Sequence, residues 1–183
     1  MRALNATATA ILIAATPAGA FAQQPTATST QPATTSITVD EFAQAAAQNS
    51  LSEVLLSTMA LQKSNDKRVD DQAWTMLDHH SRAMGDLADA LSPDAAALPS
   101  EPSAEQKAVL QRMQGLQGTE FDQAYFQHQM EAHEKAIEVF EQAGNLDDQS
   151  VANYARVTLP ILQAHQSITE YRMGQDPQPM PGK

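Results

Sequence analysis

The sequence contains no cysteine, little glycine and few basic residues, and each shortage excludes a class of protein. Without cysteine, the 183-residue chain can form no disulfide, no thiolate metal site and no bacterial lipid anchor. Its 7 glycines form no glycine-rich phosphate-binding loop. Lys and Arg total 11 against 22 Asp and Glu, a formal net charge of -11. We therefore expect no nucleic-acid partner, because affinity for a phosphate backbone depends on clustered cations.

The first 22 residues have the pattern of a signal peptide. Arg2 supplies a positive charge, residues 11–15 form a short apolar core, and Ala20-Phe21-Ala22 is a small-x-small cleavage site. The apolar run is too short to span a membrane, so we interpret it as part of a cleaved signal and not as an anchor. We expect cleavage after Ala22. These features predict export to the periplasm or cell envelope of a Gram-negative bacterium, with no transmembrane segment in the mature chain. They do not identify a protein partner.

Two polar segments flank the predicted domain. Residues 23–37 consist mainly of Thr, Ser, Ala, Pro and Gln, and we predict a disordered leader because they offer little to bury. Residues 174–183 contain three prolines and are predicted to be a disordered tail. Residues 38–173 are left for one domain of ordinary size.

Apolar residues recur at spacings of three and four within that domain, which is the period of an amphipathic helix. Capping and breaking signals divide the domain into four long helices and one shorter helix, predicted at residues 38–63, 66–91, 103–114, 119–143 and 148–173. No stretch has the alternation of a strand. We therefore predict an all-α four-helix bundle with an extra short helix in the middle crossover.

Local signals predict how some of these helices begin and bend. Thr38 and Glu41 form a capping box at the first start, and Thr119 with Asp122 resembles one at the start of the fourth helix. Pro160 lies inside the last helix, where it removes a backbone hydrogen bond and should produce a kink.

Four polar residues fall among the apolar residues of four different long helices: Glu53, His80, His133 and His165. Each unsatisfied polar group in a core costs roughly 1–3 kcal/mol, so these side chains must contact one another, water or a metal. Imidazoles with one carboxylate suit zinc, iron or copper, and we interpret the four as ligands of one transition-metal ion. The alternative is a hydrogen-bonded core that only fixes the register of the helices.

Neighbouring residues extend the candidate site. His79 lies at the edge of its apolar stripe, close enough to turn inward. Met76, Met84 and Met130 lie within a turn of His80 or His133, and Met together with His favours copper, Cu(I) in particular. Methionine at helical spacing is more often core filler, so copper is the second choice of metal.

Several short motifs together resemble a known family, the domain of unknown function 4142. They are Leu51-Ser52-Glu53-Val54, Met76-Leu77-Asp78-His79-His80, Phe121-Asp122-Gln123-Ala124-Tyr125, His133-Glu134-Lys135-Ala136-Ile137 and Leu159-Pro160-Ile161-Leu162-Gln163-Ala164-His165. The resemblance covers about residues 38–172. It implies an exported bacterial protein with a ferritin-like helical bundle, of a kind often labelled outer membrane protein, whose function is undefined.

The resemblance also marks the polar residues. The three histidines and Glu53 fall on the family's recurring polar positions. Two departures concern acids that usually precede the first two histidines, because His79 and Ala132 occupy those places here. Their loss could weaken the groups that orient the ligands or alter the metal preference. The Met-x-x-His-His pattern is also similar, more weakly, to a family of small exported copper-binding helical proteins.

A ferritin-like bundle would suggest ferroxidase activity, which the residues do not support. A di-iron site needs Glu-x-x-His motifs on two helices, but Leu77, Met130 and Leu162 stand three residues before the histidines. No Ser-His-Asp triad is recognisable either. Two hypotheses remain: an exported metal-binding protein for buffering or envelope stress, and a non-catalytic structural or interaction protein of the envelope.

Overall fold

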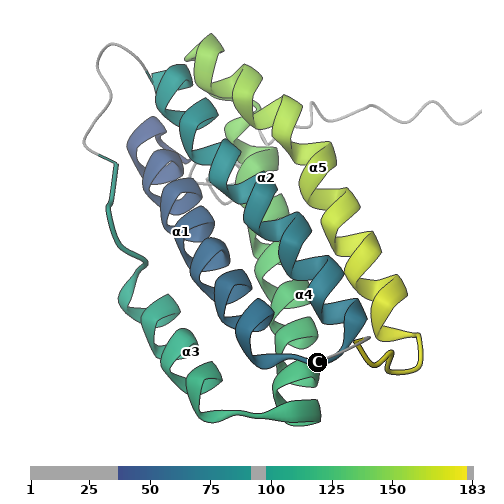
Figure 1. Cartoon of the computed structure of the whole chain (residues 1–183). Helices are drawn as coiled ribbons and strands as arrows, with labels where there is room; N and C mark the ends of the chain where they lie inside the picture. The colour runs from purple at the N-terminus through teal and green to yellow at the C-terminus, as the bar shows by residue number, and fades with distance from the viewer. Residues whose placement is uncertain (1–36, 92–97, 181–183) are drawn as a thin grey trace, which may run out of the picture. The chain divides into compact units, whose positions relative to one another are not determined.

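The computed structural model describes residues 37–91 and 98–180, which form five α-helices (Figure 1). They are α1 (Val39–Lys63), α2 (Lys67–Leu91), α3 (Ala104–Gly115), α4 (Gly118–Ala143) and α5 (Gln149–Met173). The only β-pairing in the described part is one isolated bridge. The predicted all-α bundle with a short extra helix is therefore confirmed. The predicted signal peptide and nearly all of the predicted leader lie outside the described residues.

The four long helices pack as two pairs, α1 with α2 and α4 with α5. Contacts of α1 with α4 and of α2 with α5 join the two pairs into one bundle. The short helix α3 belongs to the crossover between α2 and α4, and it lies against α1 and α4 (Figure 1). The bundle therefore presents one face of each long helix to a common interior.

The helix starts test the predicted capping boxes. The Thr38 hydroxyl accepts from the Glu41 amide, and the Glu41 carboxylate accepts from the Thr38 amide, as predicted. The prediction for Thr119 and Asp122 was wrong, because α4 already begins at Gly118. Gly118 has φ 54°, which glycine adopts without strain, and it places Thr119 inside the first turn. Asp122 instead accepts a hydrogen bond of 2.6 Å from the Ser64 hydroxyl.

The last helix continues through Pro160, which lies on its exposed side. The backbone bond that proline cannot make is therefore lost on the face toward water, where it costs least. The kink remains a prediction.

Two apolar clusters fill the interior at different levels of the bundle. The first contains Phe42, Phe140, Tyr154 and Leu162, with Phe42 and Phe140 packed edge to face at 4.9 Å between ring centroids. The second, nearer the α1–α2 turn, includes Leu56, Val69, Met113, Phe121 and Tyr125.

Buried polar side chains lie between the two apolar clusters and, at Gln72 and its partner Thr169, extend to the level of the second cluster. We call this set the polar layer: Glu53, Gln72, His80, Gln129, His133, His165 and Thr169. Such a layer is stable only where its members find partners, because water is excluded there. The candidate site lies in this layer.

The segment after α5 was predicted to be a loose tail, but its described part pairs with the α1–α2 turn. The Lys67 amide donates to the Gln178 carbonyl at 2.6 Å, and the Met180 amide donates to the Asn65 carbonyl at 2.9 Å. The sequence gives little sign of this, because the partners are backbone groups of a distant turn.

A buried ion pair holds the same region. Arg68 contacts Asp66 at 2.7 Å, with side-chain exposures of 10% and 5%. Arg68 also donates to the Arg172 and Gln175 carbonyls at the end of α5. The pair therefore joins the α1–α2 turn to the C-terminal segment.

We expect Arg68→Ala to destabilise the protein by about 3–5 kcal/mol, because it leaves the buried Asp66 carboxylate without its counter-charge. Lys67→Ala is the matched control, since its ion pair with Asp71 is nearly half exposed and should be worth about 0–1 kcal/mol. Urea denaturation of both variants measures the difference. Equal, small losses would mean that the Asp66–Arg68 pair contributes no more than a surface ion pair.

Candidate metal centre

Three of the four predicted ligands meet in the polar layer. His80 of α2, His133 of α4 and His165 of α5 are 3%, 1% and 2% exposed. Each offers a ligand nitrogen, and these atoms lie within 4.8 Å of one another. The ring centroids are 5.2 Å apart for His133–His165, 5.7 Å for His80–His165 and 5.8 Å for His80–His133. We call these three residues the histidine cluster.

The helical period explains why the rings converge. His80 follows the buried Ala73 and Met76 at spacings of seven and four, so it shares their inward face. His133 stands in the same relation to Phe126 and Gln129 on α4.

The hydrogen bonds fix the tautomers of neutral rings. His133 Nδ1 lies 2.8 Å from the Gln129 carbonyl oxygen, which can only accept, so His133 Nδ1 carries the proton. The unprotonated His133 Nε2 then accepts a hydrogen bond from His165 Nδ1 at 3.1 Å. The bare His165 Nε2 in turn accepts from His79 Nδ1 at 2.7 Å. A directed chain thus runs from the exposed His79 to the Gln129 carbonyl.

His80 is outside this chain. Its Nε2 is buried and has no hydrogen-bond partner among the described residues. Burial lowers the pKa of His80 well below its usual range, and the neighbouring His133 and His165 lower it further. Burial, with His133 and His79, also lowers the pKa of His165 to about 3. His80 and His165 are therefore neutral at physiological pH, which is the form that binds a metal.

Glu53 is buried as predicted, with 1% exposure, but it is not part of the histidine cluster. Its carboxylate accepts a hydrogen bond of 2.5 Å from Gln129 Nε2. Gln129 precedes His133 by one turn of α4, so Glu53 is paired one turn away from that ring. Burial raises the pKa of Tyr125 well above its usual value, and the nearby Glu53 charge adds to the rise.

The second-tier residues have separate environments. His79 is exposed at the surface, and its ring meets that of His165 edge to edge through their hydrogen bond, with centroids 5.0 Å apart. It therefore lies beside the histidine cluster, against the ring of one member. Met76 is fully buried one turn before His80, and Met84 packs against the first apolar cluster. Met130 is half-buried.

Sequence reasoning missed the amide and hydroxyl partners of the polar layer. Gln129 contacts Glu53 and also accepts from His133 through its carbonyl. Gln72 donates to the Thr169 hydroxyl at 2.7 Å, and that hydroxyl donates to the His165 carbonyl at 2.7 Å. Glutamine and threonine occur on so many helices that only their position among the regularly spaced apolar residues could have indicated these roles.

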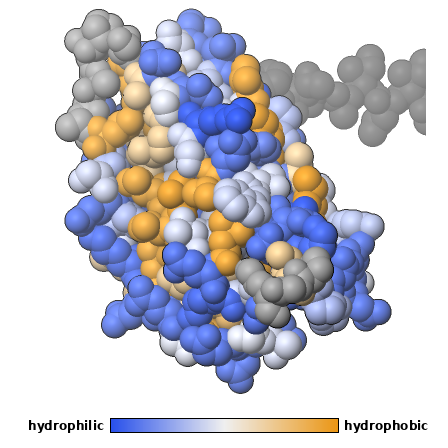
Figure 2. Space-filling model, viewed as in Figure 1, coloured by the Kyte–Doolittle hydropathy of each residue, from blue (hydrophilic) through white to orange (hydrophobic). Residues whose placement is uncertain are grey.

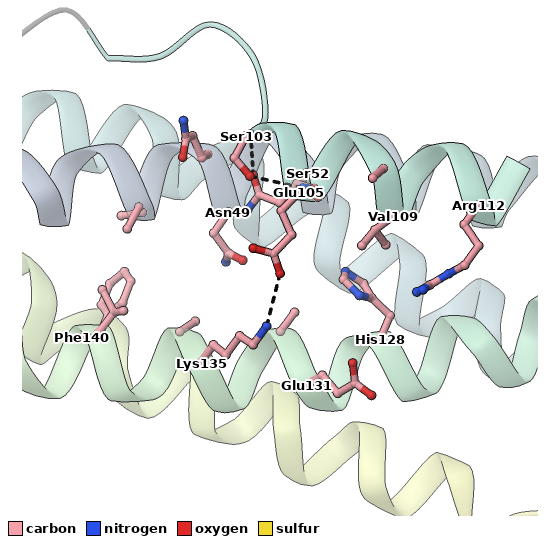
Figure 3. Close-up of a pocket in the computed structure, with 18 residues that line it drawn as sticks. Asn49, Ser52, Ser103, Glu105, Val109, Arg112, His128, Glu131, Lys135 and Phe140 are labelled. Carbon is pink, nitrogen blue, oxygen red and sulfur yellow. Dashed lines mark hydrogen bonds and ion pairs between the residues drawn. The ribbon is translucent and has the colours of Figure 1, made fainter.

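A cavity of about 560 Å³ lies between α1, α3 and α4 (Figure 3). None of the three histidines of the cluster lines it. His128 projects into it beside Arg112, and Lys135 and Glu105 form an ion pair of 3.6 Å across it (Figure 3). His128 is half-buried there. Its ring is not a member of the cluster.

The fold and site define a class: a four-helix bundle with a buried three-histidine group that could hold a metal ion. Residues 23–170 match the domain of unknown function DUF4142, so the chain belongs to this family. No curated protein and no solved structure matches the chain.

The surface adds few constraints. Among the described helices, none combines the length and apolarity needed to cross a membrane. On the face shown in Figure 2, apolar residues gather along the middle and hydrophilic residues surround them. Trp74 is 59% exposed.

The lowered pKa of His165 predicts how the stability of the metal-free protein depends on pH. An unfolded histidine takes up a proton near pH 6.5, whereas folded His165 does so near pH 3. The unfolded state therefore binds more protons between these values, and the free energy of unfolding should fall as the pH falls. His165→Asn should reduce this slope by up to one proton, about 1.4 kcal/mol per pH unit.

Urea denaturation between pH 7.5 and pH 4 measures this difference. Carboxylates titrate in both proteins, so their contribution to the pH dependence of the free energy of unfolding largely cancels in the comparison. Parallel curves for wild type and His165→Asn would contradict the assignment of a buried neutral ring.

Proposed function

We propose that this protein binds one divalent transition-metal ion through His80, His133 and His165. The observation that carries the proposal is the convergence of three buried imidazoles with nitrogens within 4.8 Å of one another. Two nitrogens bound to one tetrahedral zinc ion, each at 2.0–2.1 Å, lie about 3.4 Å apart. Small side-chain movements would therefore complete the site.

The partners of the rings also suit metal binding. A ligand histidine usually donates its second ring N–H to a carbonyl or another acceptor, which orients the ring. His133 donates in this way to Gln129 and presents Nε2 to the cluster. His80 contributes a nitrogen that has no other partner.

Binding would require His165 and His79 each to change tautomer. The hydrogen bond between His165 Nδ1 and His133 Nε2 occupies both nitrogens, so a metal held by these two atoms must replace it. The His165 proton would then reside on Nε2 and be donated to His79 Nδ1. His79 would carry its own proton on the other ring nitrogen.

Imidazole ligands suit zinc, iron and copper. We propose a role in metal buffering or in protection of the envelope under stress, because the residues provide a site for a metal but no recognised catalytic motif. Glu53 would act from outside the ligand set, through Gln129. The competing hypothesis is a structural or interaction protein in which the polar layer only fixes the helix register.

Metal binding should stabilise the wild-type protein by about 2.7 kcal/mol at a free metal concentration one hundred times the dissociation constant. Zn²⁺, Fe²⁺ and Cu²⁺ would each be added to metal-free, untagged protein at neutral pH while thermal unfolding is followed. His133→Ala should abolish the response, because it removes a ligand from the centre of the site.

Two other histidine variants make this test specific. His128→Ala should respond like wild type, because His128 lies in a different cavity. His79→Ala should still bind but about 10–100-fold more weakly, since it removes only the partner of His165. A wild-type protein whose unfolding ignores all three metals would favour the structural hypothesis.

We also propose export to the periplasm or cell envelope. The support is the signal-peptide pattern of residues 1–22. Mass spectrometry of the protein made in a Gram-negative host should find a mature N-terminus at Gln23. An intact N-terminus on cytoplasmic protein would contradict export.

A further inference from the structure

A second cavity, of about 250 Å³, adjoins the histidine cluster between α1, α2 and α5. His79, His80 and His165 line it, whereas His133 does not. Arg82 and Asp86, both exposed, also line it, so the cavity reaches the surface. One side of the cluster is therefore accessible from solvent although the rings themselves are buried.

The arrangement of ligands makes this side the free one. His133 comes from α4 and does not line the cavity. A metal held by all three nitrogens would border the space that His80 and His165 line. Structural zinc sites are closed by four protein ligands, whereas sites with three protein ligands keep a position for water or another small molecule.

The charge of the site favours an anion at that position. Three neutral imidazoles leave the full charge of a divalent ion. The Glu53 carboxylate is paired with Gln129, and Asp86 lines the cavity together with Arg82, with both side chains exposed. A buried net charge is unfavourable unless a counter-charge accompanies it. A cavity of this size admits a water molecule or a small anion.

We propose that the metal centre keeps one coordination position open toward this cavity, and that a small monovalent anion such as azide or hydroxide binds there. This inference rests on the proposed metal binding. It adds that one ligand of the bound ion exchanges with solvent, whereas an ion enclosed by protein ligands would have no exchangeable ligand.

Cobalt(II) is a suitable probe, because its visible absorption reports coordination number and ligand type. The full mature protein would be loaded with Co²⁺ and titrated with sodium azide. We expect a saturable change in the cobalt bands with one azide per metal. Ala83→Leu places a larger side chain in the cavity and should weaken azide binding by about tenfold or more, with cobalt binding retained.

Ala88→Leu is the matched control, because Ala88 is half-buried on the same helix but does not line the cavity. It should bind azide like wild type. Circular dichroism would verify that both variants remain folded.

The failures are distinguishable. If cobalt does not bind, the proposed metal function itself is wrong. If cobalt binds but azide leaves its spectrum unchanged, the metal site stands and the open position is overturned. Equal azide affinity in Ala83→Leu and wild type would likewise overturn access through this cavity.

Discussion

Everything in the interior depends on one constraint: polar groups buried in the middle of the bundle must find partners without water. Apolar side chains above and below can repack or slide at modest cost, since dispersion contacts have no fixed direction. Hydrogen bonds, in contrast, do have a fixed direction. Gln129 to Glu53 joins α4 to α1, His133 to His165 joins α4 to α5, and Gln72 to Thr169 joins α2 to α5. The polar layer therefore sets the relative heights of all four long helices.

The sequence predicted the helices well because their signals are local. The hydrophobic period, the Thr38 capping box and the break after Lys63 depend only on neighbouring residues. Where a prediction failed, a non-local or backbone feature decided the outcome. Gly118, with its left-handed backbone, lies at the start of α4, and the described part of the C-terminal segment pairs with backbone groups of a turn more than one hundred residues earlier.

The site was predictable to the level of helix faces and no further. The spacing of the apolar residues predicted that three histidines point inward, and the antiparallel packing of neighbouring helices predicted that they could meet. The same reasoning grouped Glu53 with them, because a buried stripe is wide enough to hold residues that point toward different neighbours. Only the side-chain geometry reveals that Glu53 reaches Gln129, one turn from His133. Spacing likewise could not distinguish His79, which contacts His165 from the surface, from a fourth ligand.

The two hypotheses for the histidine cluster make different demands on its nitrogens. A core held by hydrogen bonds alone should pair every buried ring nitrogen, because each unpaired one costs about 1–3 kcal/mol. The chain from His79 through His165 to His133 meets this demand, since both nitrogens of His165 and of His133 are paired. His80 does not meet it, because its buried Nε2 has no partner among the described residues.

A water molecule in the adjoining cavity could satisfy one nitrogen, but it would not explain why three rings from three helices face one another. A bound cation would account for both features at once, since it would give His80 Nε2 a partner and replace the one hydrogen bond between His133 and His165. The His133–Gln129 bond already holds the ring in the orientation that such an ion requires. The balance of pairing therefore favours the metal.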